Sequence, residues 1–372
     1  MACTENSATK PGSDHGRGFR ILVINPGSTS TKIAVYVDEH MLFQETVSHE
    51  SAELAKIGGV SKQYQMRLDA ILGALGKHGE SVTDFDAVVG RGGLLKPVES
   101  GVYEVNEEMV RDLTGAGSVP HASNLGAPLA REIAARARAR AFIADPVVVD
   151  ELWDVARLSG LPEIPRRSVF HALNHKAVAR QAARDLGMRY EDLNLVVAHL
   201  GGGITVGAHL KGRVVDVSNG LDGEGPFTPE RAGAVPALGV VDLCFSGKYS
   251  EDQVMRKLVG AGGLVAYLGT SDASEVERRI GAGDERAEII FEAMAYQVAK
   301  EIGAYAAVLS GDVDAIILTG GLAHSRRMVE WIRDRVSFIA PVMVYPGENE
   351  MQALAQACLR VLRGEEEAKV YR

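Results

Sequence analysis

Short apolar runs rich in β-branched residues alternate along the chain with longer segments in which apolar residues recur at helical spacing. The short runs predict strands and the longer segments predict amphipathic helices. The predicted strands are Ile21–Ile24, Ile33–Val37, Ala87–Val89, Phe142–Ile143, Leu195–Ala198, Ile204–Ala208, Val214–Val217, Ala315–Leu318 and Val342–Tyr345. The predicted helices are Tyr64–Lys77, Glu107–Leu113, Ala127–Ala139, Ala172–Leu186, Ser250–Leu258, Asp284–Leu309, Ser325–Phe338 and Glu350–Leu362. This pattern is typical of an α/β protein in which helices cover sheets.

Two segments share one layout. Ile21–Tyr36 and Leu195–His209 each contain an apolar strand, a loop of glycine or hydroxyl residues, and a second apolar strand. Such a loop can wrap its backbone N–H groups and hydroxyls around a phosphate, because glycine permits close backbone approach. A single Gly/Ser hairpin is usually only a tight turn. Two of them, with a third glycine-rich loop late in the chain, predict a duplicated fold built around a nucleotide.

The length of 372 residues fits two domains, and 46% hydrophobic with 24% charged residues is typical of a globular protein. We expect residues 1–19 to form a disordered leader rather than a secretion signal. The first domain is predicted at 20–180 and the second at 181–349, with the last helix, in 350–372, packing back on the first domain.

The formal net charge of −9 argues against broad nucleic-acid binding and against binding to an anionic membrane surface. A local cluster of basic residues could still bind an anionic substrate. Cys3, Cys244 and Cys358 are odd in number and far apart, which indicates unpaired thiols in a cytoplasmic protein. We expect no segment that spans a membrane.

The familiar nucleotide motifs are missing. The chain has no G-x-x-x-x-G-K-[ST] sequence and no G-x-G-x-x-G that opens a helix after the first strand. The sequence therefore disfavours a P-loop or a Rossmann domain.

Six segments together resemble the acetate kinase family. They are INPGSTSTK (24–32), VVGRGG (88–93), HASNLG (121–126), FHALNHKAVAR (170–180), AHLGGG (198–203) and LTGGLAHS (318–325). Three further segments, 145–160, 222–233 and 345–355, are more similar to its butyrate kinase branch. The resemblance runs in order from about Arg20 to the end of the chain. It implies the fold shared by sugar kinases, actin and Hsp70, with two ribonuclease-H-like domains and the active site in the cleft between them.

The resemblance also implies an activity. Such kinases move the γ-phosphoryl group of ATP, with Mg²⁺, onto a carboxylate by direct in-line transfer, and the reaction is reversible. For the butyrate branch it reads butanoate + ATP = butanoyl phosphate + ADP. A branched-chain acid such as isobutyrate, a hydroxyl acceptor such as a sugar, and a non-catalytic nucleotide switch remain as alternatives. Close relatives imply a homo-oligomer.

Four residues are the candidate catalytic groups. Arg91 follows a predicted strand and precedes two glycines, so its guanidinium could fork onto a carboxylate or a phosphoryl oxygen. The resemblance assigns it to the substrate and the transferring phosphoryl group, and assigns His171 to the phosphoryl oxygens in the transition state. It places Asp145 at the family's catalytic aspartate. Arg231 is the nearest candidate to replace an arginine of acetate kinases, because their T-R-S-G-type segment is absent here.

The remaining assignments also follow from the resemblance. His121 would line the substrate cleft, and Asn25 and Glu350 would lie on the Mg²⁺ side. His175 could be structural or functional. For Asp150 and Glu151 the ordinary expectation for surface carboxylates, exposure to solvent, applies instead. Gly202 stands where acetate kinases carry Asn. The expected nucleotide-binding residues are Ser28, Ser30, Lys32, His199, Gly201, Gly202, Gly203, Gly320 and Gly321. For His199, a buried, hydrogen-bonded structural role is the alternative.

Overall fold

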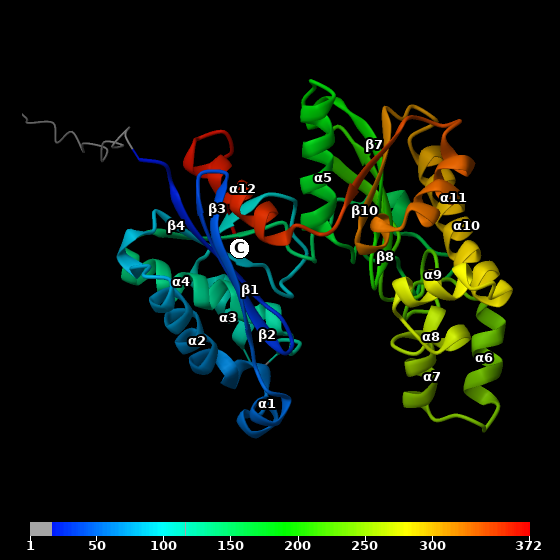
Figure 1. Ribbon diagram of the computed structural model, residues 1–372, viewed down its shortest axis with the longest axis horizontal. Helices are drawn as coiled ribbons and strands as arrows, with labels where there is room; N and C mark the ends of the chain where they lie inside the picture. Colours follow the sequence, from blue (N-terminus) through cyan, green and yellow to red (C-terminus); the bar gives the residue numbers. More distant parts are fainter. Residues whose placement is uncertain (1–16, 116) are drawn as a thin grey trace, which may run out of the picture.

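The computed structural model describes residues 17–115 and 117–372. Most of the predicted leader and Cys3 therefore lie outside the described residues. Within them the chain forms two lobes, each built on a mixed sheet with helices on both faces (Figure 1). No helix in the described part of the chain is both long enough and apolar enough to cross a membrane. Cys244 is exposed, Cys358 is buried, and both are free thiols.

The first sheet has the strand order β12-β5-β6-β4-β1-β2-β3. Strand β1 pairs antiparallel with β2 and parallel with β4, which is in turn parallel to β6. Its strands are β1 (Arg20–Pro26), β2 (Ser30–Val37), β3 (His40–Ser48), β4 (Ala87–Arg91), β5 (Val102–Glu104), β6 (Arg140–Ala144) and β12 (Lys369–Val370).

The second sheet repeats this connectivity. Its order β11-β10-β7-β8-β9 matches β6-β4-β1-β2-β3 strand for strand. Strand β7 is antiparallel to β8 and parallel to β10, and β10 is parallel to β11. The strands are β7 (Asn194–Leu200), β8 (Ile204–Leu210), β9 (Arg213–Val217), β10 (Ala315–Gly320) and β11 (Val342–Pro346). The two glycine loops of the sequence thus occupy equivalent turns, β1–β2 and β7–β8.

Helices cover both faces of the first sheet. Because successive strand residues point to opposite faces, Leu22 and Ile24 pack with helices on one side while Ile21 and Val23 pack on the other. The first side holds α2 (Tyr64–Lys77), α3 (Glu107–Thr114) and α4 (Gly126–Ala137), and the second holds α12 (Glu350–Leu362). The last long helix therefore lies on the first lobe (Figure 1).

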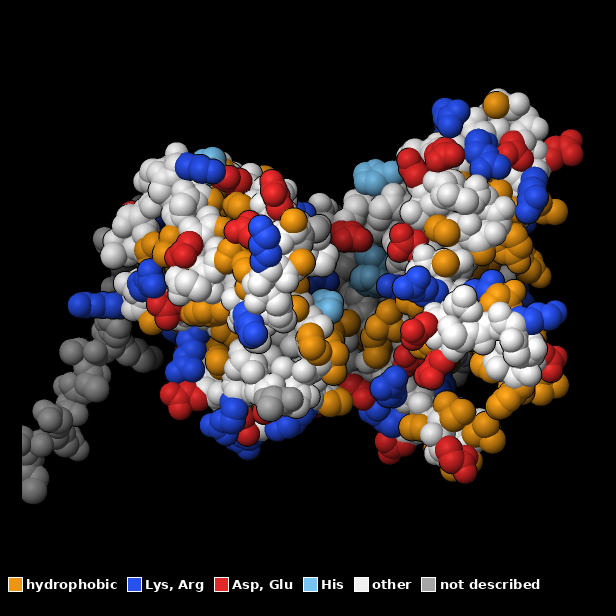
Figure 2. Space-filling view, turned by 90° about the horizontal axis from the view of Figure 1, so that it is seen from below, with side chains coloured by type: hydrophobic (Ala, Val, Ile, Leu, Met, Phe, Trp, Pro, Cys, Tyr) orange, Lys and Arg blue, Asp and Glu red, His pale blue; other side chains and the backbone are white. Residues whose placement is uncertain are grey.

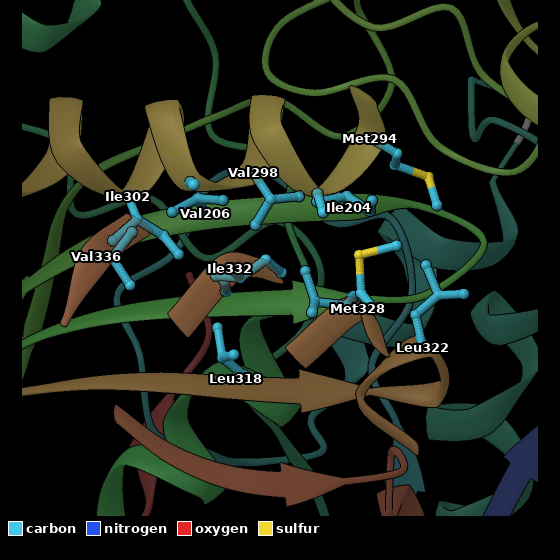
Figure 3. Packing of buried hydrophobic residues seen from close by; sticks show 14 of the residues in the cluster. Ile204, Val206, Met294, Val298, Ile302, Leu318, Leu322, Met328, Ile332 and Val336 are labelled. Atoms are coloured by element: carbon cyan, nitrogen blue, oxygen red, sulfur yellow. The ribbon is translucent and has the colours of Figure 1, made fainter. Parts of the chain in front are cut away.

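The second sheet is covered in the same way. Helices α10 (Glu285–Val308) and α11 (Arg326–Val336) pack on one face, where Met294, Val298 and Ile302 lie over Ile204 and Val206 of β8 (Figure 3). Helix α5 (Ala172–Asp185) packs on the other face through Val178, Ala179, Ala182 and Ala183. The predicted domain limit at residue 180 falls inside α5, and residues on both sides of it contact the second sheet.

Several elements were not predicted. Strand β3 lies at a sheet edge and leaves most of its side chains exposed, so its apolar signal is weak. Helix α6 (Ala237–Phe245) buries none of its side chains, and Phe245 is 86% exposed, so no helical face marks it. The other helices of the described residues are α1 (Ser51–Ile57), α7 (Glu251–Leu258), α8 (Gly263–Leu268) and α9 (Ala273–Gly281). Of these only α7 was predicted, and its capping box of Ser250 and Gln253 gives it a clear start.

Candidate active site

A cavity of about 310 Å³ lies between the lobes. Figure 2 shows the hollow there, with histidine side chains inside it. Both lobes contribute to its wall, and seven of the predicted site residues line it: Arg91, His121, Asp145, His171, His199, Arg231 and Glu350. The structure thus brings together residues that are far apart in the sequence.

The sheets explain this convergence. Arg91 is the last residue of β4, and Asp145 directly follows β6. Parallel strands of one sheet end at the same edge, and a crevice outside those carboxyl ends is the usual binding place in open α/β sheets. The equivalent edge of the second sheet carries the β7–β8 loop and Gly320 at the end of β10. The two edges face the same cavity.

Glu350 ties the first lobe's residues together. Its Oε1 lies 2.5 Å from NH1 of Arg91, and its Oε2 accepts a hydrogen bond of 2.7 Å from Nδ2 of Asn25. The Arg91 side chain keeps 36% exposure, so part of its guanidinium remains open toward the cavity. Bridging by Glu350 holds that guanidinium in place before any ligand binds.

Asp145 sits on strained backbone. Its φ of +38° lies in the left-handed region, and Pro146 follows it. Its Oδ1 accepts hydrogen bonds from Ser100 Oγ (2.7 Å) and Gly101 N (2.8 Å). These bonds compensate the strain and fix the buried carboxylate at the cavity wall, which is a frequent property of functional sites.

His199 and His171 stack, with ring centroids 3.8 Å apart and 16° between the planes. Nδ1 of His199 donates to Oδ1 of Asn174 (2.7 Å), whose Nδ2 donates to the Glu348 carbonyl (3.1 Å). Among the described residues, Nε2 of His199 has no hydrogen-bond partner, and Glu348 Oε1 lies 3.6 Å away. A Cβ on Gly201 would come within 2.8 Å of this nitrogen, so it faces the β7–β8 loop. Since Nδ1 carries the proton that Asn174 accepts, Nε2 can donate to a phosphate oxygen only when the ring carries a second proton.

The charges around the cavity are positive beside His171. Burial, then His199, Arg231 and Arg91, hold the pKa of His171 well below its ordinary value. The ring is therefore neutral near pH 7, with one N–H donor and one acceptor. His121 is similar: burial and Arg91 lower its pKa, and its Nδ1 caps Ser123 N (3.3 Å).

Arg231 reaches the cavity from the segment that follows β9. Its NH1 donates to the Gly220 carbonyl at 2.5 Å, and burial lowers its pKa. Thr228 Oγ1 accepts from the Arg231 backbone N–H (3.1 Å) and donates to the Gly202 carbonyl (2.7 Å). A Cβ on Gly203 would meet the end of the Arg231 side chain, so a larger residue there would displace the guanidinium. Arg231 therefore packs against the β7–β8 loop.

The first loop rests on Arg67, which sequence reasoning missed. This fully buried guanidinium on α2 donates to the carbonyls of Ser28 (3.2 Å) and Ser30 (2.8 Å), to Thr31 Oγ1 (2.9 Å) and to Gln63 Oε1 (2.9 Å). The contact with backbone carbonyls leaves the loop's exposed side free. An arginine on a helix gives no such signal in the sequence.

Other predicted nucleotide residues lie beside the cavity rather than in its wall. Lys32 and Arg91, after His199, help to hold the pKa of the Glu348 carboxyl below its ordinary value, which places Lys32 near that carboxyl. Gly320 has φ +89°, and a Cβ there would run into the backbone of Leu200, so only glycine fits. At Gly202 nothing lies within 4 Å of a Cβ. No contact to the site is found for the Ser28 and Ser30 hydroxyls among the described residues.

The oxygen donors fit Mg²⁺. No group of three or more His, Cys, Asp or Glu side chains converges among the described residues. Asp145, Glu350 and Asn25 instead supply separate side-chain oxygens. Of these, Asp145 Oδ1 and Glu350 Oε2 already accept hydrogen bonds. Mg²⁺ keeps most of its waters and binds through one or two carboxylates plus substrate phosphates. These residues would therefore hold it largely through water.

One expectation near the site is wrong. Glu151 does not face solvent: it is 7% exposed and forms a buried ion pair with Lys176 (2.7 Å), and it also accepts from Val214 N (2.8 Å). The pair joins α5 to the segment after Asp145. Asp150 pairs with Arg157 at 2.6 Å. Asn174, Thr205 and Glu348 are further wall residues that were not singled out. Asn174 and Glu348 lay inside quoted motifs, which was the available signal.

Comparisons with known proteins agree with this architecture. An acetate kinase from Porphyromonas gingivalis superposes with a TM-score of 0.76 at 20% identity, over 91% of this chain and 99% of that one. A propionate kinase from Francisella tularensis subsp. tularensis SCHU S4 superposes with a TM-score of 0.72 at 20% identity, over 91% of this chain and 98% of that one. An acetate kinase from Entamoeba histolytica superposes with a TM-score of 0.74 at 16% identity, over 92% of this chain and 100% of that one. At these identities the likeness concerns the fold, and it confirms the predicted α/β fold class with two ribonuclease-H-like halves.

The sequence itself gives the family. The sequence profile of the acetokinase family matches residues 163–352, just over half of the chain. That range includes α5, every strand of the second sheet and the residues His171, His199 and Arg231. From this match we conclude that the chain belongs to the acetokinase family.

Proposed function

We propose that this protein transfers the γ-phosphoryl group of Mg-ATP to the carboxylate of a short-chain acid, and that butanoate is its preferred acceptor. The reaction is butanoate + ATP = butanoyl phosphate + ADP, and it is reversible. The observation that carries the proposal is the cavity in which Arg91, Arg231 and the neutral His171 meet beside an apolar wall. Two guanidinium groups suit two anions that must approach each other.

The chemistry needs no covalent intermediate with the protein. A carboxylate oxygen attacks the γ-phosphorus while the bond from that phosphorus to the ADP oxygen breaks, and ADP leaves with the electron pair. Arg91 binds the acid and, with Arg231, offsets the charge on the phosphoryl group. His171 donates an N–H to a phosphoryl oxygen. Asn25, Asp145 and Glu350 would hold Mg²⁺, which would neutralise phosphate charge when bound.

The proposed nucleotide contacts lie on the loops at the two sheet edges. Backbone N–H groups of Gly202 and Gly203 would bind phosphate oxygens, and the Gly201 N–H shapes the loop by donating to the Gly203 carbonyl (3.2 Å). His199 would donate from Nε2 to the same phosphate oxygens when its ring carries a second proton. Ser28, Ser30 and Lys32 would meet the phosphates from the first loop, and Gly320 and Gly321 would pass the adenosine. Arg67 supports the first loop through its hydrogen bonds to the Ser28 and Ser30 carbonyls.

Acid preference rests on the apolar part of the wall. It contains Leu94, Pro146, Val147, Val169, Phe170 and Leu173. Each buried methylene contributes about 0.8 kcal/mol, so acids that differ by one carbon differ by only about 1–3 kcal/mol. Butanoate or a branched acid such as isobutyrate would use this surface better than acetate. His121 is proposed to contact the acid. A homo-oligomeric state and a cytoplasmic location stay predictions.

The test is acyl phosphate formation trapped as a hydroxamate with hydroxylamine. Purified protein and Mg-ATP are incubated with acetate, propionate, butyrate, isobutyrate, valerate or isovalerate, and ADP release is measured with glycerol and glucose. The proposal predicts the strongest hydroxamate with four-carbon acids and none without acid. ADP release that depends only on a hydroxyl acceptor would assign a different kinase activity to the same fold.

A further inference from the structure

A chain of hydrogen-bonded side chains leads from the cavity into the core of the second lobe. Nδ1 of His171 lies 3.3 Å from Thr205 Oγ1, and that oxygen lies 3.0 Å from Nε2 of His175. Nδ1 of His175 lies 3.3 Å from Nε2 of His209, whose Nδ1 is 2.7 Å from the Tyr190 hydroxyl. We name these five residues the histidine relay.

The members of the relay other than His171 are buried. Thr205, His175 and His209 have no exposed surface, and Tyr190 is 3% exposed. The histidines come from successive turns at the start of α5 and from β8, and Tyr190 comes from the short 3₁₀ turn Tyr190–Asp192. The rings of His175 and His209 stack 5.5 Å apart at 13°. Buried polar atoms must find partners within the protein, so these contacts are obligatory.

The groups of the relay are uncharged. Burial is the main cause that lowers the pKa of His171, His175 and His209 well below the ordinary value, and it raises that of Tyr190 well above its own. A neutral imidazole has one N–H donor and one acceptor nitrogen. Every link of the relay must therefore have one donor and one acceptor, and the direction of one link fixes the next.

Tyr190 sets that direction. Within the residues that the structure describes, its hydroxyl has His209 Nδ1 as its hydrogen-bond partner. If His209 donated to the oxygen, the phenolic hydrogen would be buried without an acceptor, which costs about 1–3 kcal/mol. The phenol therefore donates to Nδ1 of His209. It follows that His209 donates from Nε2 to His175, His175 donates from Nε2 to Thr205, and Thr205 donates to Nδ1 of His171.

We propose that Tyr190, His209, His175 and Thr205 are positioning residues that hold His171 in the tautomer with its proton on Nε2. Nδ1 of His171 is occupied by Thr205, so Nε2 is the nitrogen available to the cavity. The role rests on the proposed function, in which that N–H meets a phosphoryl oxygen. The opposite tautomer would present a lone pair to the same oxygen. The relay thus orients the Nε2–H donor of His171, which faces the cavity.

The direct test measures the proton positions. Protein labelled with ¹⁵N-histidine is studied by long-range ¹H–¹⁵N correlation, with signals assigned by single His→Gln variants. The relay predicts Nε2–H tautomers for His171, His175 and His209. Tyr190→Phe removes the first donor and should make these tautomers mixed. A wild-type His171 protonated on Nδ1, or three unchanged tautomers in Tyr190→Phe, would overturn the proposal.

Kinetics give a second readout. Thr205→Val keeps the side-chain shape without the hydroxyl, and should lower kcat about tenfold with little change in KM, since the donor acts in the transition state. Thr205→Ser restores the hydroxyl and should recover most of the rate. Tyr305→Phe is the control, because it removes another buried hydroxyl of the same lobe that is not in the relay. Equal rates for Thr205→Val and Thr205→Ser would contradict the relay.

The two proposals fail separately. Predicted tautomers in a protein that forms no acyl phosphate from any acid would support the relay and overturn the proposed function. Acyl phosphate formation with His171 protonated on Nδ1 would overturn the relay and support the proposed function.

Discussion

Arg91 and Glu350 form an ion pair, NH1 to Oε1 at 2.5 Å, that joins the last residue of β4 to the first residue of α12. The other carboxylate oxygen accepts from Asn25 at the end of β1. Glu350 therefore links three segments that are far apart in the sequence at one point beside the cavity. The helix at the end of the chain is thus a part of the site, and its packing on the first lobe has a functional consequence.

Arg91→Ala should lower kcat/KM for the acid about a thousandfold, roughly 4 kcal/mol, because charge stabilisation and acid binding are lost together. Initial rates of ADP formation with and without acid measure this. Arg335→Ala is the matched control: this arginine is 33% exposed and pairs with Glu292 at 2.6 Å on the outer helices of the second lobe. Near-wild-type rates for Arg91→Ala would remove Arg91 from the mechanism.

Glu350→Gln keeps the shape of the side chain but removes its charge. If Glu350 helps to hold Mg²⁺, the free Mg²⁺ concentration that gives half-maximal rate should rise about tenfold or more. Rates are measured against free Mg²⁺ at saturating ATP and acid. Glu330→Gln on α11, where Glu330 pairs with Arg326 on the surface, should leave the curve unchanged. An unaltered Mg²⁺ requirement in Glu350→Gln would assign Glu350 only to the positioning of Arg91.

Arg67→Met should destabilise the protein by about 2–4 kcal/mol, because the carbonyls of Ser28 and Ser30 and the Thr31 hydroxyl lose a buried charged donor. Urea unfolding measures the loss. The loosened first loop should also raise KM for ATP more than KM for the acid. Arg131→Met, an exposed ion-pair partner of Glu107, should change stability by less than about 1 kcal/mol. Equal stabilities of the two variants would contradict this role.

Acid should destabilise the protein steeply. His171, His175 and His209 have pKa values lowered well below the ordinary value by burial, so below about pH 6.5 the unfolded chain binds protons that the folded chain does not. Stability is full above that pH and falls by about 1.4 kcal/mol per pH unit for each histidine, or about 4 kcal/mol per unit for three.

Urea unfolding at about pH 7.5, 6.0 and 5.5 tests this slope. His209→Asn should make it shallower by about one proton. A free energy of unfolding that is constant over this range would show that the three histidines are not held neutral in the folded protein.

The sequence predicted the parts of the site that local patterns encode. Apolar strands around Gly27 and Gly201–Gly203 give the two equivalent loops, and the residues after strands, such as Arg91 and Asp145, meet because strand ends share an edge. Arg67 and Glu151 could not be predicted in the same way. Each is a charged residue whose burial depends on partners from other elements, Ser28 and Ser30 for one and Lys176 for the other. Their local sequence does not show which partners they meet in the fold.

The histidine relay shows the same limit. The spacing of His171 and His175 indicates one face of a helix. Tyr190 and His209 join the relay only because the fold brings β8 and the turn Tyr190–Asp192 beside α5. Arg231 was proposed from its nearness in sequence to a missing motif, and the structure places it in the cavity wall. Its role in catalysis stays a prediction.

The most direct measurement is ³¹P NMR of the protein with Mg-ATP and butyrate labelled with ¹⁸O in both carboxylate oxygens. We expect a new acyl phosphate resonance, shifted by one ¹⁸O in the bridge to phosphorus, together with unlabelled ADP. That result requires the carboxylate oxygen to attack the γ-phosphorus. Formation of ADP with only inorganic phosphate or a phosphate ester, and no labelled acyl phosphate from any short-chain acid, would contradict the proposed carboxylate kinase activity.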